Sequence, residues 1–215
     1  MSTDSHAHPA HLAHHFETSE QQFEASKLGT WLFLATEILM FGGLFVGYLI
    51  YHGLYPEMFA EGAATLSWKL GTLNTVVLLF SSLTMALAIH YAQTGNKSRS
   101  ELMMLITIGC GFIFMGVKAV EYTGKYDAGL LPGMYFSAEA TASNLAMYYS
   151  FYFLMTGLHG SHVLIGMGLI FWVFLRSRRG DFNPEHYTAI ECVGLFWHLV
   201  DLIWIYLFPL LYLVG

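Results

Sequence analysis

A single carboxylate lies inside the very apolar stretch TWLFLATEILMFGGLF, residues 30–45. This residue is Glu37, and two later apolar stretches also carry ionisable or hydroxyl side chains. An ionisable group at membrane depth costs about 2.5 to 3.5 kcal/mol on insertion scales, so each such position is a candidate for ligand binding, proton transfer or hydrogen bonding between helices. The stretches FYFLMTGLHGSHVLIGMGLI and ECVGLFWHLVDLIW supply Thr156, His159, His162, Glu191, His198 and Asp201.

The spacing of these side chains places them in two stripes. The first three recur every three positions and the last three are seven and then three positions apart, so each set follows one side of a helix. Stripes on consecutive antiparallel helices can face each other and satisfy donors and acceptors that lipid cannot. Two histidines and two carboxylates are also sufficient to ligate a metal ion or a haem, and the same groups can relay protons. Because the Glu-x-x-His pairs of di-iron bundles are absent, we predict an interhelical polar network and no metal site.

A further charged pair stands near the end of the apolar stretch GFIFMGVKAVEY. Lys118 and Glu121 are three residues apart, which brings their side chains together on a helix. We predict an interfacial ion pair with a structural role.

Membrane-spanning helices must position all these groups. The chain has 215 residues, of which 55% are hydrophobic and 11% charged, a balance that is unusual for a water-soluble domain. An apolar helix of about 20 residues crosses the ~30 Å hydrocarbon layer at ~1.5 Å per residue. The sequence therefore predicts an all-α, polytopic membrane protein, a bundle of five transmembrane helices with no room for a soluble catalytic domain. The five apolar runs lie at residues 28–52, 69–92, 102–122, 145–175 and 188–213.

Basic residues predict the orientation, because Lys and Arg in short loops stay on the cytoplasmic side. Lys69 and Lys125 lie on one side of the five spans, and the larger group lies on the side of the N-terminus: Lys27, Lys97, Arg99, Arg176, Arg178 and Arg179. We therefore predict the N-terminus inside and the C-terminus outside. Residues 1–26 are predicted to form a mobile, His-rich cytoplasmic tail, and residues 27–215 the transmembrane domain.

Several stretches of the chain resemble subunit III of the haem-copper respiratory oxidases, from about Lys27 to the end. KLGTWLFLATEILMFGGLF is similar to the family's segment around its membrane-embedded, carbodiimide-reactive carboxylate, with Glu37 at the matching position. LNTVVLLFSSLTMALAIHYA and GFIFMGVKAVEY are similar to the two helices that follow. The most specific match is FYFLMTGLHGSHVLIG with FWHLVDLIWIYLFPLLYLVG. Since the chain has room for five helices and not seven, it resembles the short bacterial form.

The resemblance implies an accessory subunit that has no cofactor of its own. Haem and copper are expected in the partner subunit I, and subunit II of the oxidase and membrane lipids are the other expected partners. Bound phospholipid and a respiratory supercomplex are further options, and no nucleic acid is expected. The implied location is the bacterial cytoplasmic (inner) membrane. In agreement, Cys110 and Cys192 lie too far apart in the sequence for the close Cys pair of a binuclear copper site.

The resemblance further implies the function of a non-catalytic subunit III of a proton-pumping terminal cytochrome c oxidase in aerobic respiratory electron transport. Such a subunit supports assembly, proton uptake and turnover stability of the haem-copper subunit. Quinol oxidases carry a similar subunit, often with Asp in place of Glu37, so cytochrome c is favoured as the donor. The alternatives are a quinol oxidase, a nitric-oxide-reductase-associated relative, a stand-alone proton carrier and a membrane metalloenzyme. For Glu37, three roles stay open: a structural carboxyl, a modulator of proton supply to the large subunit, and, least favoured, a catalytic acid.

Overall fold

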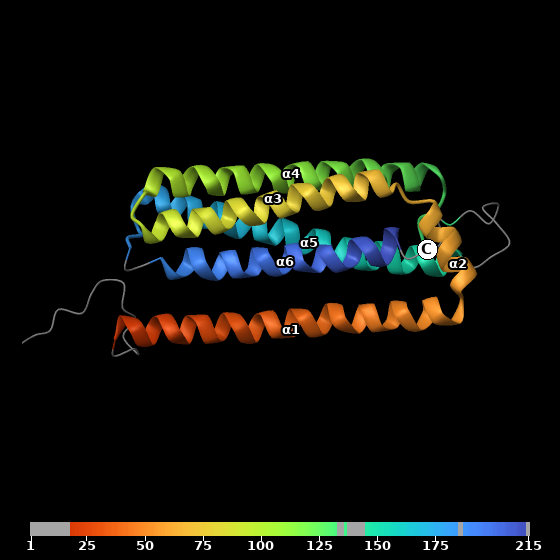
Figure 1. Ribbon diagram of the computed structural model, residues 1–215, viewed down its shortest axis with the longest axis horizontal. Helices are drawn as coiled ribbons and strands as arrows, with labels where there is room; N and C mark the ends of the chain where they lie inside the picture. The colour runs from red at the N-terminus through yellow and green to blue at the C-terminus, as the bar shows by residue number, and fades with distance from the viewer. Residues whose placement is uncertain (1–17, 133–135, 137–144, 185–186, 214–215) are drawn as a thin grey trace, which may run out of the picture.

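Five long α-helices run side by side in the computed structural model of the chain, and a short helix closes one end of the bundle (Figure 1). The structure describes residues 18–132, 136, 145–184 and 187–213. In these ranges, five helices are long and apolar enough to cross a membrane. They confirm the prediction of an all-α protein with five long apolar helices. The helices are α1 (Ser19–Leu54), α2 (Pro56–Ala64), α3 (Trp68–Gln93), α4 (Lys97–Asp127), α5 (Leu145–Arg179) and α6 (Thr188–Tyr212).

The first helix begins earlier than its apolar run. The sequence predicted a span from residue 28 and a tail over residues 1–26, whereas α1 already begins at Ser19. The side chain of Thr18 caps this end, because its hydroxyl accepts a hydrogen bond of 3.1 Å from the backbone N–H of Gln21. Hydropathy indicates which part of a helix lies in the hydrocarbon layer. Helix α1 continues beyond that part through the polar residues that precede it.

The short helix α2 was not predicted, because its segment was expected to be a plain connection between two spans. Pro56 stands at its first position, where the missing N–H costs nothing. Its Phe59 is fully buried, with ring centroids 4.9 Å from Tyr48 of α1 and 5.7 Å from Tyr148 of α5. These aromatic contacts hold α2 against the end of the bundle.

The long helices are arranged with α5 and α6 between α1 and the α3–α4 pair (Figure 1). Helix α1 contacts chiefly α6, while α6 also contacts α3 and α5. The tight turn between α3 and α4 contains Gly95, whose φ of +75° is a conformation that other residues rarely adopt. Asn96 follows and caps α4, since its side chain accepts from the backbone N–H of Arg99 at 3.3 Å.

The C-terminal end of α6 is held by tyrosines from two other helices. The last carbonyl groups of a helix have no partner within it. Tyr48 donates its hydroxyl hydrogen to the carbonyl of Leu210, and Tyr148 donates to that of Leu211, each at 3.0 Å. Two of the terminal carbonyl groups of α6 are thereby bonded inside the protein.

Candidate functional site

Glu37 meets His162 where α1 approaches α5. Oε2 of the carboxyl lies 2.8 Å from Nε2 of the imidazole. The two side chains are 14% and 11% exposed, so the pair lies near the edge of the bundle. Phe41, one turn along α1, packs edge-on against the imidazole with ring centroids 5.3 Å apart. The structure thus joins two predicted site residues that the sequence had not paired with each other.

The hydrogen bonds of His162 fix the number of protons on this pair. Nδ1 lies 2.8 Å from the carbonyl oxygen of Leu158, which can only accept, so Nδ1 carries a hydrogen. The contact between Nε2 and Glu37 then requires one further proton, bound either to the carboxyl or to Nε2. In both arrangements the pair is neutral overall, as a low-dielectric surrounding favours. It therefore holds one proton that either partner can carry.

The second oxygen of Glu37, Oε1, has no hydrogen bond to any residue in the described part of the chain, and it is not enclosed. A hollow of about 430 Å³ lies between α1, α5 and α6, and one of its wall residues, Phe196, packs with its ring centroid 6.2 Å from that of His162. The carboxyl therefore offers one acceptor to a molecule outside this chain.

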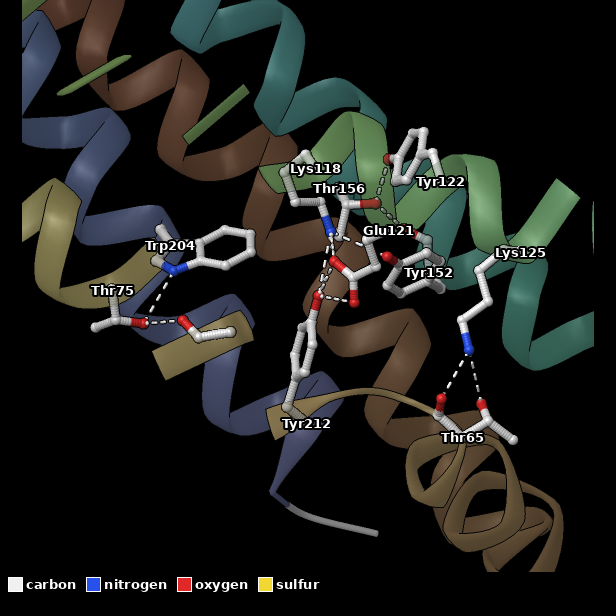
Figure 2. Close-up of polar contacts among 11 residues, drawn as sticks. Thr65, Thr75, Lys118, Glu121, Tyr122, Lys125, Tyr152, Thr156, Trp204 and Tyr212 are labelled. Atoms are coloured by element: carbon white, nitrogen blue, oxygen red, sulfur yellow. Dashed lines mark hydrogen bonds and ion pairs between the residues drawn. The ribbon is translucent and has the colours of Figure 1, made fainter. Parts of the chain in front are cut away.

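Lys118 is the centre of a polar cluster inside the bundle. Its Nζ donates to Glu121 Oε2 at 2.8 Å and to the hydroxyls of Tyr152 and Tyr212 at 2.9 and 3.1 Å. Tyr212 in turn donates to the Glu121 carboxylate, whose two oxygens are both 2.8 Å away. Figure 2 shows these side chains converging from α4, α5 and α6. All three donors of the ammonium group are used within the cluster.

Aromatic rings enclose the same ammonium group. The Nζ of Lys118 lies 4.8 to 5.8 Å from the ring centroids of Tyr122, Tyr152, Trp204 and Tyr212, within the range of cation–π attraction. The side chains of Lys118 and Glu121 are only 6% and 5% exposed. The ion pair lies inside the bundle, where aromatic residues of α5 and α6 cover it.

Thr156 is bonded to α4 and not to α6. Its hydroxyl donates to the carbonyl of Tyr152 at 2.6 Å and lies 2.5 Å from the hydroxyl of Tyr122. Because the Thr156 hydrogen is used by the carbonyl, Tyr122 is the donor in the second bond.

The side chains of the α6 stripe point to different neighbours. Glu191 forms a salt bridge of 2.7 Å with Lys27 of α1, and His198 Nδ1 lies 2.7 Å from the Ser82 hydroxyl of α3. Within the described ranges no hydrogen bond joins the α5 stripe to the α6 stripe. Four of the six residues contact polar groups on other helices and not one another, because α6 contacts three helices and turns successive polar residues toward different ones.

The remaining two predicted residues are deeply buried, and the Ser82 hydroxyl lies beside the Asp201 carboxyl. His159 and Asp201 are 0% and 3% exposed, and their side-chain nitrogens and oxygens have no hydrogen bond to a described residue. The ring of His159 packs against Trp204 at 5.3 Å and against the edge of Phe114 at 5.4 Å. These two residues do not pair with each other.

Sequence patterns did not predict the partners of the polar groups: Lys27, Ser82, Tyr152 and Tyr212. Tyr152 carried a usable signal, since it lies four residues before Thr156 and so continues the α5 stripe. Lys27 was interpreted only as a marker of orientation. No group of three or more His, Cys, Asp or Glu side chains in the described part of the protein is placed to hold a metal ion.

The long apolar helices and their buried polar contacts define a multi-pass membrane protein. Residues 7–215 match the family described as Cytochrome c oxidase subunit III, and the chain belongs to this family. It is 35% identical over 192 residues to the Cytochrome c oxidase subunit 3 of Thermostichus vulcanus, an alignment that covers 87% of this chain and 86% of the relative. The family resemblance is confirmed, and the chain is a subunit of a terminal oxidase complex.

Relatives of a second kind also match. The chain is 26% identical over 213 residues to the Probable quinol oxidase subunit 3 of Staphylococcus haemolyticus, with 96% of this chain and 97% of the relative covered. The same values hold for the Probable quinol oxidase subunit 3 of Staphylococcus aureus (strain USA300). Family membership thus includes oxidases with two kinds of electron donor.

Proposed function

We propose that this chain is the non-catalytic subunit III of a proton-pumping cytochrome c oxidase in the bacterial cytoplasmic membrane. It would support assembly, proton uptake and turnover stability of the haem-copper subunit I, with subunit II as a second partner. Family membership supports the oxidase, and the name of the 35% identical relative supports cytochrome c as the donor. The distribution of basic residues supports an N-terminus on the cytoplasmic side.

A quinol oxidase is the second candidate, favoured by the relatives whose alignment covers nearly the whole of both chains. Glu at position 37 favours cytochrome c, because the family resemblance associates Asp at this position with quinol oxidases. The two donors are separated by purifying the native complex in mild detergent and measuring oxygen consumption with reduced cytochrome c and with a quinol.

The same preparation tests the oxidase assignment itself. A reduced-minus-oxidised spectrum should show haem that co-purifies with this chain through a larger partner subunit. A preparation that contains the chain and no haem-bearing partner would refute the assignment.

The Glu37–His162 pair carries the proposal for how this subunit acts. It holds one proton that either partner can carry, and it leaves Glu37 Oε1 open to a group outside the chain. At the edge of the bundle, such a pair can influence the proton supply of an adjoining subunit without any redox group of its own. His162 is held for this role by its bond to the Leu158 carbonyl.

Replacing Glu37 by Gln tests this role. The Gln amide can still donate to Nε2 of His162, so the α1–α5 contact and assembly should persist, while the transferable proton is lost. We expect fewer turnovers before inactivation and a lower ratio of pumped protons to electrons. Glu57→Gln, at an exposed acid on α2, is the matched control. If pumping and turnover durability match those of the control, Glu37 is a structural carboxyl only.

A further inference from the structure

The Ser82 hydroxyl of α3 lies next to two ionisable side chains of α6. Its oxygen is 2.7 Å from Nδ1 of His198, and it lies beside the carboxyl of Asp201. His198 and Asp201 are three residues apart, which places them on one side of α6. Two helices thereby bring together a carboxyl, a hydroxyl and an imidazole, each of which can both donate and accept a hydrogen bond when it is neutral.

The hydroxyl hydrogen of Ser82 is not used by its own helix. Ser81, the preceding residue, donates to the carbonyl of Leu78 at 2.7 Å, as hydroxyls inside helices often do. Among the described residues Ser82 makes no bond of this kind, and its one hydrogen bond crosses to His198 of α6. Its hydrogen can therefore turn either to the imidazole or to the Asp201 carboxyl.

Asp201 has no cation to balance a negative charge. Its side chain is 3% exposed, and no salt bridge joins it to another residue in the ranges that the structure describes. The other titratable group that acts on it is the Cys110 thiol of α4, which carries no positive charge. An ionised carboxylate without a partner is strongly disfavoured in a low-dielectric interior, so Asp201 keeps its proton.

We propose that Asp201 is a buried proton-binding site whose proton exchanges with the outside of the chain through Ser82 and His198. The O–H bond of Asp201 breaks as its proton binds the Ser82 oxygen, and the Ser82 hydrogen moves to Nδ1 of His198. Nε2 of the same ring then releases its hydrogen, since it has no bond to a described residue and is not enclosed. Ser82 and His198 each gain one proton and lose one, so one proton passes from Asp201 to the edge of α6. The same steps in reverse return a proton to Asp201.

This proton-binding site is separate from the pair of Glu37 and His162. It is built from α3 and α6, whereas that pair joins α1 to α5. The inference therefore goes beyond the proposed function, and it holds whichever donor the oxidase uses.

Infrared spectroscopy of the intact oxidase complex transferred into D₂O tests the proposal, because the C=O stretching band of a protonated carboxyl shifts when deuterium replaces its proton. A band that is present in the parent complex and missing from Asp201→Asn belongs to protonated Asp201. If that variant fails to assemble, Asp201→Glu identifies the band by moving it. Loss or movement of no band means that Asp201 is ionised, and this result overturns the proposal.

The rate at which this band shifts in D₂O tests the route of the proton. Ser82→Ala removes the hydroxyl, so we expect exchange to be at least several-fold slower, whereas Ser82→Thr keeps a hydroxyl and should retain the parent rate. His198→Gln can still bond Ser82 but cannot take up a proton on one atom and release one from another, so it should slow exchange as Ser82→Ala does.

Ser81→Ala is the matched control. It removes a hydrogen bond between the same two helices, the one that Trp197 Nε1 of α6 donates at 3.0 Å, and leaves Ser82 and His198 in place. We expect it to keep the parent rate. Equal slowing in Ser81→Ala and Ser82→Ala would show that exchange follows local changes in helix packing. An unchanged rate in Ser82→Ala, or in His198→Gln if the former fails to assemble, would show that the proton takes another route, and each of these results overturns the proposal.

Discussion

Replacing Lys118 by Met removes the ammonium group on which three helices converge. Glu121 would keep its carboxylate in a site that is 5% exposed, with Tyr212 as its one remaining donor. Breaking a buried ion pair by removing one partner typically costs about 3 to 5 kcal/mol, because the other charge stays buried. We therefore expect the variant to destabilise the packing of α4 against α5 and α6 by about this amount.

The cysteine of the same helix provides the assay. Cys110 is a free, buried thiol on α4, so its alkylation in the intact complex requires local opening of the bundle. At a factor of ten per 1.4 kcal/mol, the expected loss raises the alkylation rate on the order of a hundred- to a few-thousand-fold. Mass spectrometry separates Cys110 from Cys192.

Lys125→Met is the matched control on the same helix. Its ammonium donates to the backbone carbonyl of Thr65 at 2.7 Å at an exposed position, as Figure 2 shows. An exposed interaction of this kind contributes about 1 kcal/mol or less, so the rate should rise only several-fold.

The double variant Lys118→Met/Glu121→Leu distinguishes the effect of the unpaired charge from the effect of altered packing. With both charges removed, most of the stability should return, because an apolar pair of similar volume replaces a buried ion pair at little cost. If the double variant is as unstable as Lys118→Met alone, or if Lys118→Met is no worse than Lys125→Met, the buried charge pair is not what stabilises this region.

Two further pairs of substitutions test the packing. Gly166→Ala should lower the free energy of unfolding by about 1 to 3 kcal/mol, because a Cβ there would lie 2.8 Å from the buried ring of Trp197. At Gly168 a Cβ would meet nothing within 4 Å, so Gly168→Ala should be neutral or slightly stabilising. Tyr48→Phe should lower the free energy of unfolding by about 1 kcal/mol because it removes the hydroxyl that donates to the Leu210 carbonyl. Tyr51→Phe on the exposed face of α1 should have little effect. Thermal unfolding of the complex checks both pairs, and equal effects within either pair would contradict the packing.

Hydropathy patterns predicted the long helices of this protein but not all helix boundaries. The apolar runs located all five long helices, because the hydrocarbon layer demands a fixed length of apolar chain. They did not locate the polar start of α1 at Ser19 or the short helix α2, whose apolar residues Met58 and Phe59 occupy only one side. Hydropathy detects the residues that contact lipid. The start of α1 is instead stabilised by the Thr18 cap, and α2 by its aromatic contacts with α1 and α5.

In the candidate site too, one contact was predictable from the sequence and another was not. Lys118 and Glu121 were predictable as a pair because three residues along a helix bring side chains together. Glu37 and His162 were each singled out by their polarity in an apolar run, but they are 125 positions apart in the chain. The spacing of residues predicts which side of a helix carries them, and it does not specify which neighbour that side meets.

The sequence by itself determined the membrane architecture, the family and the polar positions, since each depends on local composition or a short motif. Tertiary structure decided the partners: Glu37 with His162, Glu191 with Lys27, and His198 with Ser82. The physical reason is that α6 lies among α1, α3 and α5 and presents a different residue to each. Only the packing of whole helices fixes which polar side chains share a proton, form an ion pair or remain without a partner.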